Sequence, residues 1–259
     1  MMSRAIQVER VGRVTIITMD RQHVRNALDA RSQEELSQAF DRFAADDDQW
    51  VAILTGAGPA AFCAGHDLGT PAPQGPHEMP RGGFGGLTGR FDLDKPVIAA
   101  VNGVAVGGGF EMALACDLIV AAQSASFALP EVKVGMVALG GGALRLPRQI
   151  GLKHAMGMML TGRRVGAAEG HALGFVNEVV ADADLRSAAL RWADAILAAS
   201  PLAVRATKRV ALGLAGHPLD RAMREQWKSP LVERLHRSAD AAEGIAAFAA
   251  RRPPAWTGR

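Results

Sequence analysis

Two glutamates and a run of three glycines are the residues of this sequence best suited to chemistry. Glu111 follows Gly107-Gly108-Gly109 in the segment VGGGFE, and Glu131 lies in the segment FALPEVKVG. A glycine run before a helix presents unpaired N–H groups and the positive end of the helix dipole, which can bind an oxyanion or a phosphate. A buried glutamate has a raised pKa and suits proton transfer. These residue types therefore suggest acid–base chemistry beside an anion-binding turn.

Each of these features has a simpler interpretation when it is taken alone. The glycine run could be a tight strand-to-helix turn without a ligand, and it matches neither a Walker loop nor a dinucleotide fingerprint. Either glutamate could be an exposed side chain. Cys63 and His66, in the segment AFCAGHDL, could form a nucleophile–base pair, but a surface histidine explains His66 equally well. Residue types alone leave the choice open.

Hydrophobic periodicity predicts the elements that must position these residues. Strands, the first pair as a β-hairpin, are predicted at 6–18, 50–55, 96–101 and 117–121. Helical spacing predicts a helix over 29–45, with Ser32 and Glu35 as a capping box, and the glycine run opens another over 110–115. The stretch 56–95 is rich in Gly and Pro, which is typical of a long functional loop.

The part of the chain after Glu131 is mainly helical by its periodicity. Helices are predicted at about 141–150, 152–160, 167–173, 182–199, 201–214 and 238–251, with one strand at 175–180. The order strand, glycine turn, helix, strand favours repeated ββα units with parallel pairing, so the predicted fold class is α/β. We predict a core over 1–200 that holds the site and a helical C-terminal subdomain over 201–259.

Composition excludes several classes of protein. The 259 residues are 49% apolar, which is ample for a buried core. The net charge is +3 and the basic residues are scattered, so we expect no nucleic-acid partner. No apolar run resembles a membrane span or a signal peptide, so we expect no membrane partner and a cytoplasmic location. Two cysteines give no disulfide framework and no metal-ligand spacing, so we expect no metal site.

Several segments together resemble the enoyl-CoA hydratase/isomerase family, also called the crotonase superfamily. They are AFCAGHDL (61–68), KPVIAAVNGVAVGGGFEMALACD (95–117), FALPEVKVG (127–135) and LTGRRVGAAEGHALGFVNEVV (160–180). The resemblance covers nearly the whole chain, starting at RNALD (25–29). It implies a crotonase-like spiral of ββα units with a helical C-terminal trimerisation region. It also implies a homotrimer, or a homohexamer built from two trimers.

The resemblance further implies what the site residues do. The main-chain N–H groups of His66 and Gly108 would grip the carbonyl oxygen of an acyl-CoA thioester as an oxyanion hole. Glu131 would exchange a proton with Cα and water, and Glu111 would hold and polarise that water. Coenzyme A is then part of the substrate, and no separate cofactor is implied. The residues implied to contact coenzyme A are Arg25, Ala64, Asp67 and Leu68.

Acidic residues at both catalytic positions favour an enoyl-CoA hydratase, which adds water to a 2-enoyl-CoA or removes it from a 3-hydroxyacyl-CoA. The first alternative is an enoyl-CoA isomerase, because many isomerases of the family keep only the residue that matches Glu131. The second is a member that binds acyl-CoA without hydratase activity, since a fold does not fix a function. One departure concerns Ala138 and Leu139, which stand where family hydratases often have Pro followed by Gly or Asp.

Two segments, 82–96 and 247–259, resemble the carnitinyl-CoA dehydratase branch of the family. A substrate of that branch carries a quaternary ammonium group, which binds best to aromatic faces or a carboxylate. Phe84 and Phe91 are the candidate aromatic residues, although packing explains them equally well. The carnitine-type substrate is therefore a hypothesis within the general reaction.

Overall fold

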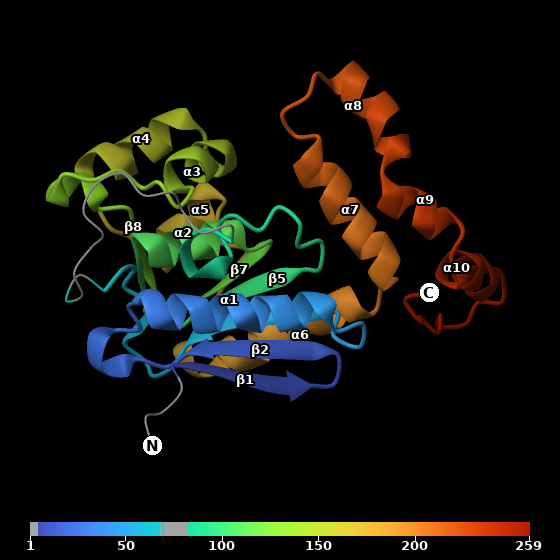
Figure 1. Cartoon of the computed structure of the whole chain (residues 1–259), viewed down its shortest axis with the longest axis horizontal. Coiled ribbons are helices and arrows are strands. Elements are labelled where there is room, and N and C mark those ends of the chain that lie inside the picture. The colour runs from blue at the N-terminus through green and yellow to red at the C-terminus, as the bar shows by residue number, and fades with distance from the viewer. Residues whose placement is uncertain (1–4, 68, 70–81) are drawn as a thin grey trace.

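The larger of two sheets runs through the body of the molecule, in a computed structural model that describes residues 5–67, 69 and 82–259. Its strand order is β1-β2-β3-β5-β7-β10, and only β1 and β2 pair antiparallel (Figure 1). The bounds are β1 Ile6–Val11, β2 Val14–Met19, β3 Val51–Gly56, β5 Val97–Val101, β7 Leu118–Ala122 and β10 Glu178–Val180. Strand β5 is buried along its whole length, as expected for a parallel strand that is covered on both faces.

The smaller sheet has four strands in the order β4-β6-β8-β9. Their bounds are β4 Ala61–Cys63, β6 Val104–Val106, β8 Ser126–Ala128 and β9 Val165–Gly166. Strands β4, β6 and β8 pair in parallel, and β9 is antiparallel to β8. Each pass of the chain places one strand in the larger sheet and the next in the smaller, as β3 and β4, β5 and β6, and β7 and β8. The expected α/β spiral of ββα units is confirmed.

Helix α1 (Ala30–Ala45) covers one side of the larger sheet (Figure 1). Leu36, Phe40 and Phe43 form its buried face, at the spacing of an amphipathic helix. The predicted capping box of Ser32 and Glu35 is wrong. Asp29 is the N-cap, because its side chain accepts a hydrogen bond from Ser32 N at 2.8 Å. Asp caps a helix as well as Ser does, and the helix begins at Ala30.

The remaining helices follow the predicted order with two additions. Their bounds are α2 Gly108–Ala115, α3 Gly142–Ile150, α4 Leu152–Thr161, α5 Ala167–Leu173, α6 Leu185–Leu197, α7 Pro201–Gly213, α8 Leu219–Glu225, α9 Pro230–His236 and α10 Ala239–Ala249. Single 3₁₀ turns are η1 Gln22–Val24, η2 Phe84–Gly86, η3 Glu131–Val134, η4 Asp182–Asp184 and η5 Gln226–Lys228. Helices α8 and α9, of seven residues each, were not predicted, although α5 of the same length was.

Helices α7 to α10 lie to one side of the body formed by the sheets and α1 to α6 (Figure 1). Ion pairs join α7 to the body, with Arg205 Nε 2.8 Å from Asp94 Oδ1 and Lys208 Nζ 2.7 Å from Asp117 Oδ2. The division into a core over 1–200 and a subdomain over 201–259 stays a prediction. Across the part of the chain that the structure describes, no helix combines the length and the apolarity that a bilayer span requires.

Candidate active site

Glu111 lies one turn inside α2 and is only 5% exposed. Its Oε1 accepts a hydrogen bond from Gly142 N at 2.9 Å. A Cβ atom added to Gly140 would overlap its Oε2, so the main chain of Gly140 also lies against the carboxylate. The turn Gly140–Gly142, here called the carboxylate turn, therefore holds Glu111 from the direction of α3. The exposed-face interpretation of this glutamate is wrong.

Burial raises the pKa of Glu111 to about 7. The amides of Gly142 and Gly140 and the charge of Arg145 oppose this rise in pKa, whereas the charge of Glu131 adds to it. A carboxyl with such a pKa gains and loses a proton close to neutral pH. The influence of Glu131 on the pKa of Glu111 also indicates that the two carboxylates belong to one site.

Glu131 is the first residue of η3, directly after β8 and Pro130. Its Oε2 is buried and has no hydrogen-bond partner among the residues that the structure describes. Its other oxygen, Oε1, faces the glycine turn, because a Cβ added to Gly107 would lie 3.2 Å from it. Burial raises the pKa of this carboxyl as well. A buried carboxylate oxygen without a partner is costly, and a bound ligand would explain it.

The loop after β4 passes directly against the glycine turn after β6. Gly65 has a φ of +90°, and a Cβ added there would lie 2.9 Å from Val106 O and 3.1 Å from Gly108 N. Only glycine combines that φ with so close an approach. The parallel pairing of β4 with β6 sets this contact, because the two loops leave the same end of the smaller sheet.

The segment that carries His66 lies against the main chain of Gly108 at this contact, and the main-chain N–H groups of His66 and Gly108 are here called the amide pair. Leu28 bridges Gly65 and Asp67, donating to Gly65 O at 2.8 Å and accepting from Asp67 N at 3.0 Å. Because successive N–H groups of an extended chain alternate in direction, the His66 N–H points away from Leu28. The Gly108 N–H belongs to the first turn of α2, where the helix provides no acceptor. The arrangement can receive a carbonyl oxygen.

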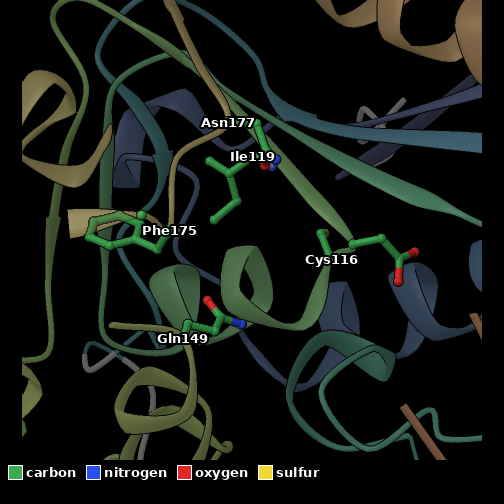
Figure 2. A pocket seen from close by; sticks show the side chains of 7 residues that line it. Cys116, Ile119, Gln149, Phe175 and Asn177 are labelled. Carbon is green, nitrogen blue, oxygen red and sulfur yellow. Dashed lines mark hydrogen bonds between the residues drawn. The ribbon is translucent and has the colours of Figure 1, made fainter. Parts of the chain in front are cut away.

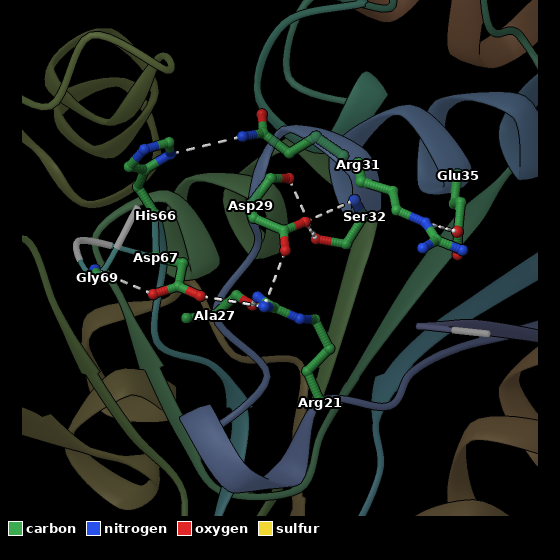
Figure 3. A network of polar contacts seen from close by, with 10 residues as sticks. Arg21, Ala27, Asp29, Arg31, Ser32, Glu35, His66, Asp67 and Gly69 are labelled. Atoms are coloured by element: carbon green, nitrogen blue, oxygen red, sulfur yellow. Dashed lines mark hydrogen bonds and ion pairs between the residues drawn. The ribbon is translucent and has the colours of Figure 1, made fainter. Parts of the chain in front are cut away.

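Figure 3 shows the polar contacts of this segment: the side chain of Asp67 pairs with Arg21, whereas the ring of His66 faces a different side chain, that of Gln33. The guanidinium of Arg21 lies 2.9 Å from Asp29 Oδ2 and 3.1 Å from Asp67 Oδ2. The His66 ring Nδ1 lies 3.5 Å from Gln33 Nε2. These contacts fix the segment that carries the His66 N–H, and the imidazole is turned to Gln33 rather than to a nucleophile.

Cys63 is fully buried, and burial raises the pKa of its thiol to about 12. A thiol with that pKa is neutral near pH 7 and is a poor nucleophile. Gly65 N donates to its Sγ at 3.3 Å. The alternative of a Cys63–His66 nucleophile–base pair is therefore not supported, and Cys63 packs as a core residue.

The structure brings three of the residues implied to contact coenzyme A next to one another. Arg25 is exposed with a φ of +54°, and its carbonyl accepts from Ala64 N at 3.1 Å. Asp67 N donates to Leu28 O, so the amides of both Ala64 and Asp67 are used inside the chain. A main-chain contact from Ala64 or Asp67 to a ligand would therefore use a carbonyl group. Leu68 lies outside the described residues.

A cavity of about 220 Å³ opens beside Glu131. Apart from Glu131 its wall is apolar, formed by Leu129, Val132, Val137, Ala138, Ala143, Met156, Met159 and Leu160. Ala138 is buried in this wall, whereas Leu139 is 76% exposed. The cavity has the character of an acyl-chain pocket that ends at one of the two glutamates.

A second cavity, of about 260 Å³, lies near the end of α2 and is shown in Figure 2. It is lined by Cys116, Asp117, Ile119, Gln149, Gly174, Phe175 and Asn177. Its polar side chains already form hydrogen bonds with the main chain. Asp117 accepts from Val97 N, and Asn177 accepts from Ile119 N. Gln149 donates to Leu114 O. Neither glutamate borders it.

Sequence reasoning missed the residues that hold Glu111. Gly140 and Gly142 contact its carboxylate, and Arg145 acts on it by charge. The glycine cluster at 140–142 was visible as a signal, but nothing in the sequence shows which side chain it contacts. Within residues 5–67, 69 and 82–259, no cluster of three His, Cys, Asp or Glu side chains could hold a metal ion.

Comparisons with known proteins give matches over the whole chain. The family model described as enoyl-CoA hydratase/isomerase matches residues 9–259. A carnitinyl-CoA dehydratase of Escherichia coli (strain K12) is 45% identical over 263 residues, and one of Proteus mirabilis (strain HI4320) is 42% identical over 262, each match covering 100% of both chains. The crystal structure of enoyl-CoA hydratase from Mycobacterium tuberculosis H37Rv has a TM-score of 0.92 and 44% identity, covering 99% of this chain and 100% of that one.

Proposed function

This chain belongs to the enoyl-CoA hydratase/isomerase family, and we propose that it is a hydro-lyase that adds water reversibly to a 2-enoyl-CoA. The family places the reaction at a thioester of coenzyme A. Relatives that are 42% to 45% identical along their full length are named carnitinyl-CoA dehydratases, and similar solved structures are titled enoyl-CoA hydratases. Both names describe addition or removal of water, which favours the hydratase over the isomerase alternative.

The proposed reaction begins with the thioester oxygen on the amide pair. The water oxygen forms a bond to Cβ while the Cα–Cβ double bond opens toward the thioester, so negative charge collects on the carbonyl oxygen. The amide pair stabilises this enolate, and one such donor typically contributes about 3–4 kcal/mol. Protonation of Cα completes the 3-hydroxyacyl-CoA, and the reverse sequence removes water.

Two carboxyls with raised pKa values supply the proton transfers in this proposal. The pair holds one proton when the substrate binds, and Glu131 gives this proton to Cα, because its carboxyl faces the glycine turn that carries Gly108. Glu111 in its ionised form holds the water and accepts a proton from it, returning the pair to one proton in total. Coenzyme A enters as part of the substrate, so the proposal needs no separate cofactor.

The observation that carries the proposal is the placement of Glu131. A buried carboxylate oxygen without a partner lies beside the glycine turn and at the mouth of an apolar cavity. A structural glutamate would be paired or exposed instead. A thioester on the amide pair with its acyl chain in the cavity would place Cα next to this oxygen.

The test is hydration of crotonyl-CoA, followed by loss of the ultraviolet absorbance of the conjugated thioester. The wild-type protein should be active, whereas Glu111→Gln and Glu131→Gln should each lower kcat by about 10²-fold or more. Glu34→Gln, an exposed glutamate on α1, is the matched control and should keep full activity. A Glu111→Gln variant that stays active with a 3-enoyl-CoA would favour the isomerase. A wild-type protein that binds acyl-CoA but turns over neither substrate would favour the non-catalytic alternative.

A carnitine-type substrate is the second candidate, supported by the names of the relatives at 42% to 45% identity. Of the two candidate aromatic residues, Phe91 already has the guanidinium of Arg145 over its ring, at 5.7 Å. Phe84 is buried, and its ring contacts the main chain at Gly108. Phe84 is therefore the better candidate to face a substrate cation. Turnover of crotonyl-CoA without turnover of crotonobetainyl-CoA would exclude this narrower substrate.

The expected homotrimer or homohexamer is part of the proposal. Helices α7 to α10, with the turn η5 between α8 and α9, carry large apolar side chains on their surface, which is typical of an interface in a larger assembly. They are Leu212, Leu219, Met223, Trp227, Ile245 and Phe248, each between 56% and 88% exposed. Sedimentation equilibrium of the purified protein should give three or six times the chain mass. The cytoplasmic location stays a prediction.

A further inference from the structure

The guanidinium of Arg145, in the first half of α3, packs on the main chain of the carboxylate turn. A methyl group added to Gly141 would overlap its Nη1, and Gly141 has a φ of +109°. Its Nη2 donates to Thr88 O at 2.8 Å, and its Cζ lies 5.7 Å from the centre of the Phe91 ring. The Arg145 N–H also donates to Gly141 O at 2.8 Å. Arg145 therefore fastens the carboxylate turn to the segment that carries Thr88 and Phe91.

The charged groups around Glu111 are few. Among the described residues, Glu131 from η3 and Arg145 from α3 are the charged side chains that act on it. Strand β4 contributes Cys63, which is neutral because burial raises the pKa of its thiol to about 12. Strand β6 and turn η2 contribute only Val, Ala, Phe and Gly side chains. Arg145 is thus the one positive charge among these groups.

We propose that Arg145 is a positioning residue for the hydration reaction: it holds the carboxylate turn in place and its charge favours the ionised form of Glu111, so that Glu111 can hold the reacting water. This inference rests on the proposed hydratase function. It also explains why the half-buried guanidinium of Arg145 lies against a small loop and donates to a main-chain carbonyl, while among the described residues it forms no ion pair with a carboxylate.

The charge of Arg145 changes the pKa of Glu111 in one direction only. Burial raises the pKa of Glu111, and the positive charge of Arg145 lowers it again. A neutral side chain at position 145 should therefore raise the pKa of Glu111 further, by roughly one unit for a nearby charge that is partly screened. Glu111 would then be protonated over more of the neutral range and would no longer accept a proton from water.

A direct titration of Glu111 tests the effect of Arg145 on its pKa and does not require catalytic turnover. The carboxyl carbons of the glutamates are labelled with ¹³C, and the Glu111 signal is identified by its loss in Glu111→Gln. Arg145→Gln should move the Glu111 midpoint upward by roughly one unit. Arg148→Gln is the matched control, because Arg148 is exposed on the same helix and donates only to Leu144 O, at 2.9 Å. An unchanged midpoint in a folded Arg145→Gln protein would overturn the proposal.

The pH dependence of kcat/KM on crotonyl-CoA gives a second readout. In Arg145→Gln the acid limb should move to higher pH with the Glu111 midpoint, and activity should recover partly at alkaline pH. Arg145→Lys keeps the positive charge and should keep the limb near its wild-type position, which also covers the case that the Gln variant fails to fold. An equal loss at every pH would mean a structural role only and would refute the inference. If the wild-type protein hydrates no enoyl-CoA, the proposed function fails, but the titration still decides whether Arg145 controls Glu111.

Discussion

Glu111 and Glu131 are two carboxylates in one site, and each is buried enough to have a raised pKa. Like charges placed together disfavour the doubly ionised state, so such a pair tends to keep one proton over a range of pH. General acid–base catalysis of water addition needs that state, with one acid and one base. The burial that raises both pKa values therefore adapts ordinary glutamates to work near neutral pH.

The pH profile of kcat/KM should have two limbs. Activity should fall below pH 7, where Glu111 becomes protonated because burial raises its pKa to about 7. It should also fall as the pH rises through the pKa of Glu131, which burial raises above its ordinary range. Glu111→Gln should lose the acid limb and keep a low residual rate, measured as initial rates on crotonyl-CoA from pH 5 to 9. An acid limb that persists unchanged in this variant would assign it to another group.

Glu111 should also make the stability of the protein depend on pH. Its pKa is raised from an ordinary 4.5 to about 7, so the folded state binds this proton more tightly than the unfolded state. The stability due to this proton is present below pH 4.5 and is lost as the pH rises through 7. Glu111→Gln should therefore gain up to about 3 kcal/mol over wild type between pH 5 and pH 8. Urea unfolding at both pH values measures this, and an equal difference at the two would contradict it.

At the scale of elements, close approaches of the main chain create the site. The loop after β4 touches the turn after β6 at Gly65, and the carboxylate turn touches Glu111 at Gly140. Side chains at these contacts would separate the loops, because a Cβ atom has no room there. The amide pair therefore depends on glycine at positions that donate no catalytic group themselves.

Gly65→Ala should disable the amide pair. The added methyl would lie 2.9 Å from Val106 O and 3.1 Å from Gly108 N, and φ of +90° is unfavourable for alanine. We expect kcat on crotonyl-CoA to fall by about 10²-fold, the usual effect of losing one oxyanion donor.

Gly12→Ala is the control, because Gly12 has a φ of +57° but open space around it. It should cost about 1 kcal/mol of stability and leave kcat unchanged. Equal kcat losses in both variants would refute a specific role for the Gly65 contact.

Sequence reasoning recovered the elements with strong periodicity and missed the four short strands of the smaller sheet and the short helices α8 and α9. The runs that became β3, β5 and β7 and most of the long helices were predicted, because five or more apolar or amphipathic positions define a period. Strands β4, β6, β8 and β9 have three residues or fewer, so no alternation can be recognised in them. Tertiary pairing alone defines the smaller sheet, and that sheet aligns the two loops of the amide pair.

The candidate site was predictable only to the extent that local motifs carry it. VGGGFE placed Glu111 and Gly108 on one helix turn, and the family resemblance supplied the pairing with His66 and Glu131. The contacts of Glu111 with Gly142 and Arg145 were not predictable, since they join positions 31 residues or more apart in the sequence. The types of two residues so far apart in the sequence do not show whether the residues lie close together in space.

At the scale of the whole molecule, α7 to α10 contact the body through a few polar links. Arg205 and Lys208 pair with Asp94 and Asp117, and Arg209 donates to Phe91 O at 2.8 Å. The outer surface of these helices keeps large apolar side chains in contact with water. A single copy would leave this apolar surface exposed, which favours assembly with further copies.

Charged substitutions on that surface should weaken the assembly. Phe248 is 88% exposed and Trp227 is 66% exposed. Phe248→Glu or Trp227→Glu should lower the average mass in sedimentation at micromolar concentration, because a carboxylate in an apolar contact loses its hydration. Val8→Glu, on the exposed edge strand β1, is the control and should leave the mass unchanged. Monomeric wild-type protein would contradict this prediction.

The spiral order of the strands has a consequence for how fast the protein becomes active. Strands β4, β6 and β8 lead into the loops that carry His66, Gly108 and Glu131, and these residues come from three separate passes of the chain. Pairings between distant segments form late during folding, whereas helices form within microseconds. After dilution from denaturant, catalytic turnover should therefore return more slowly than the circular-dichroism signal of the helices, with a lag that reflects closure of the smaller sheet.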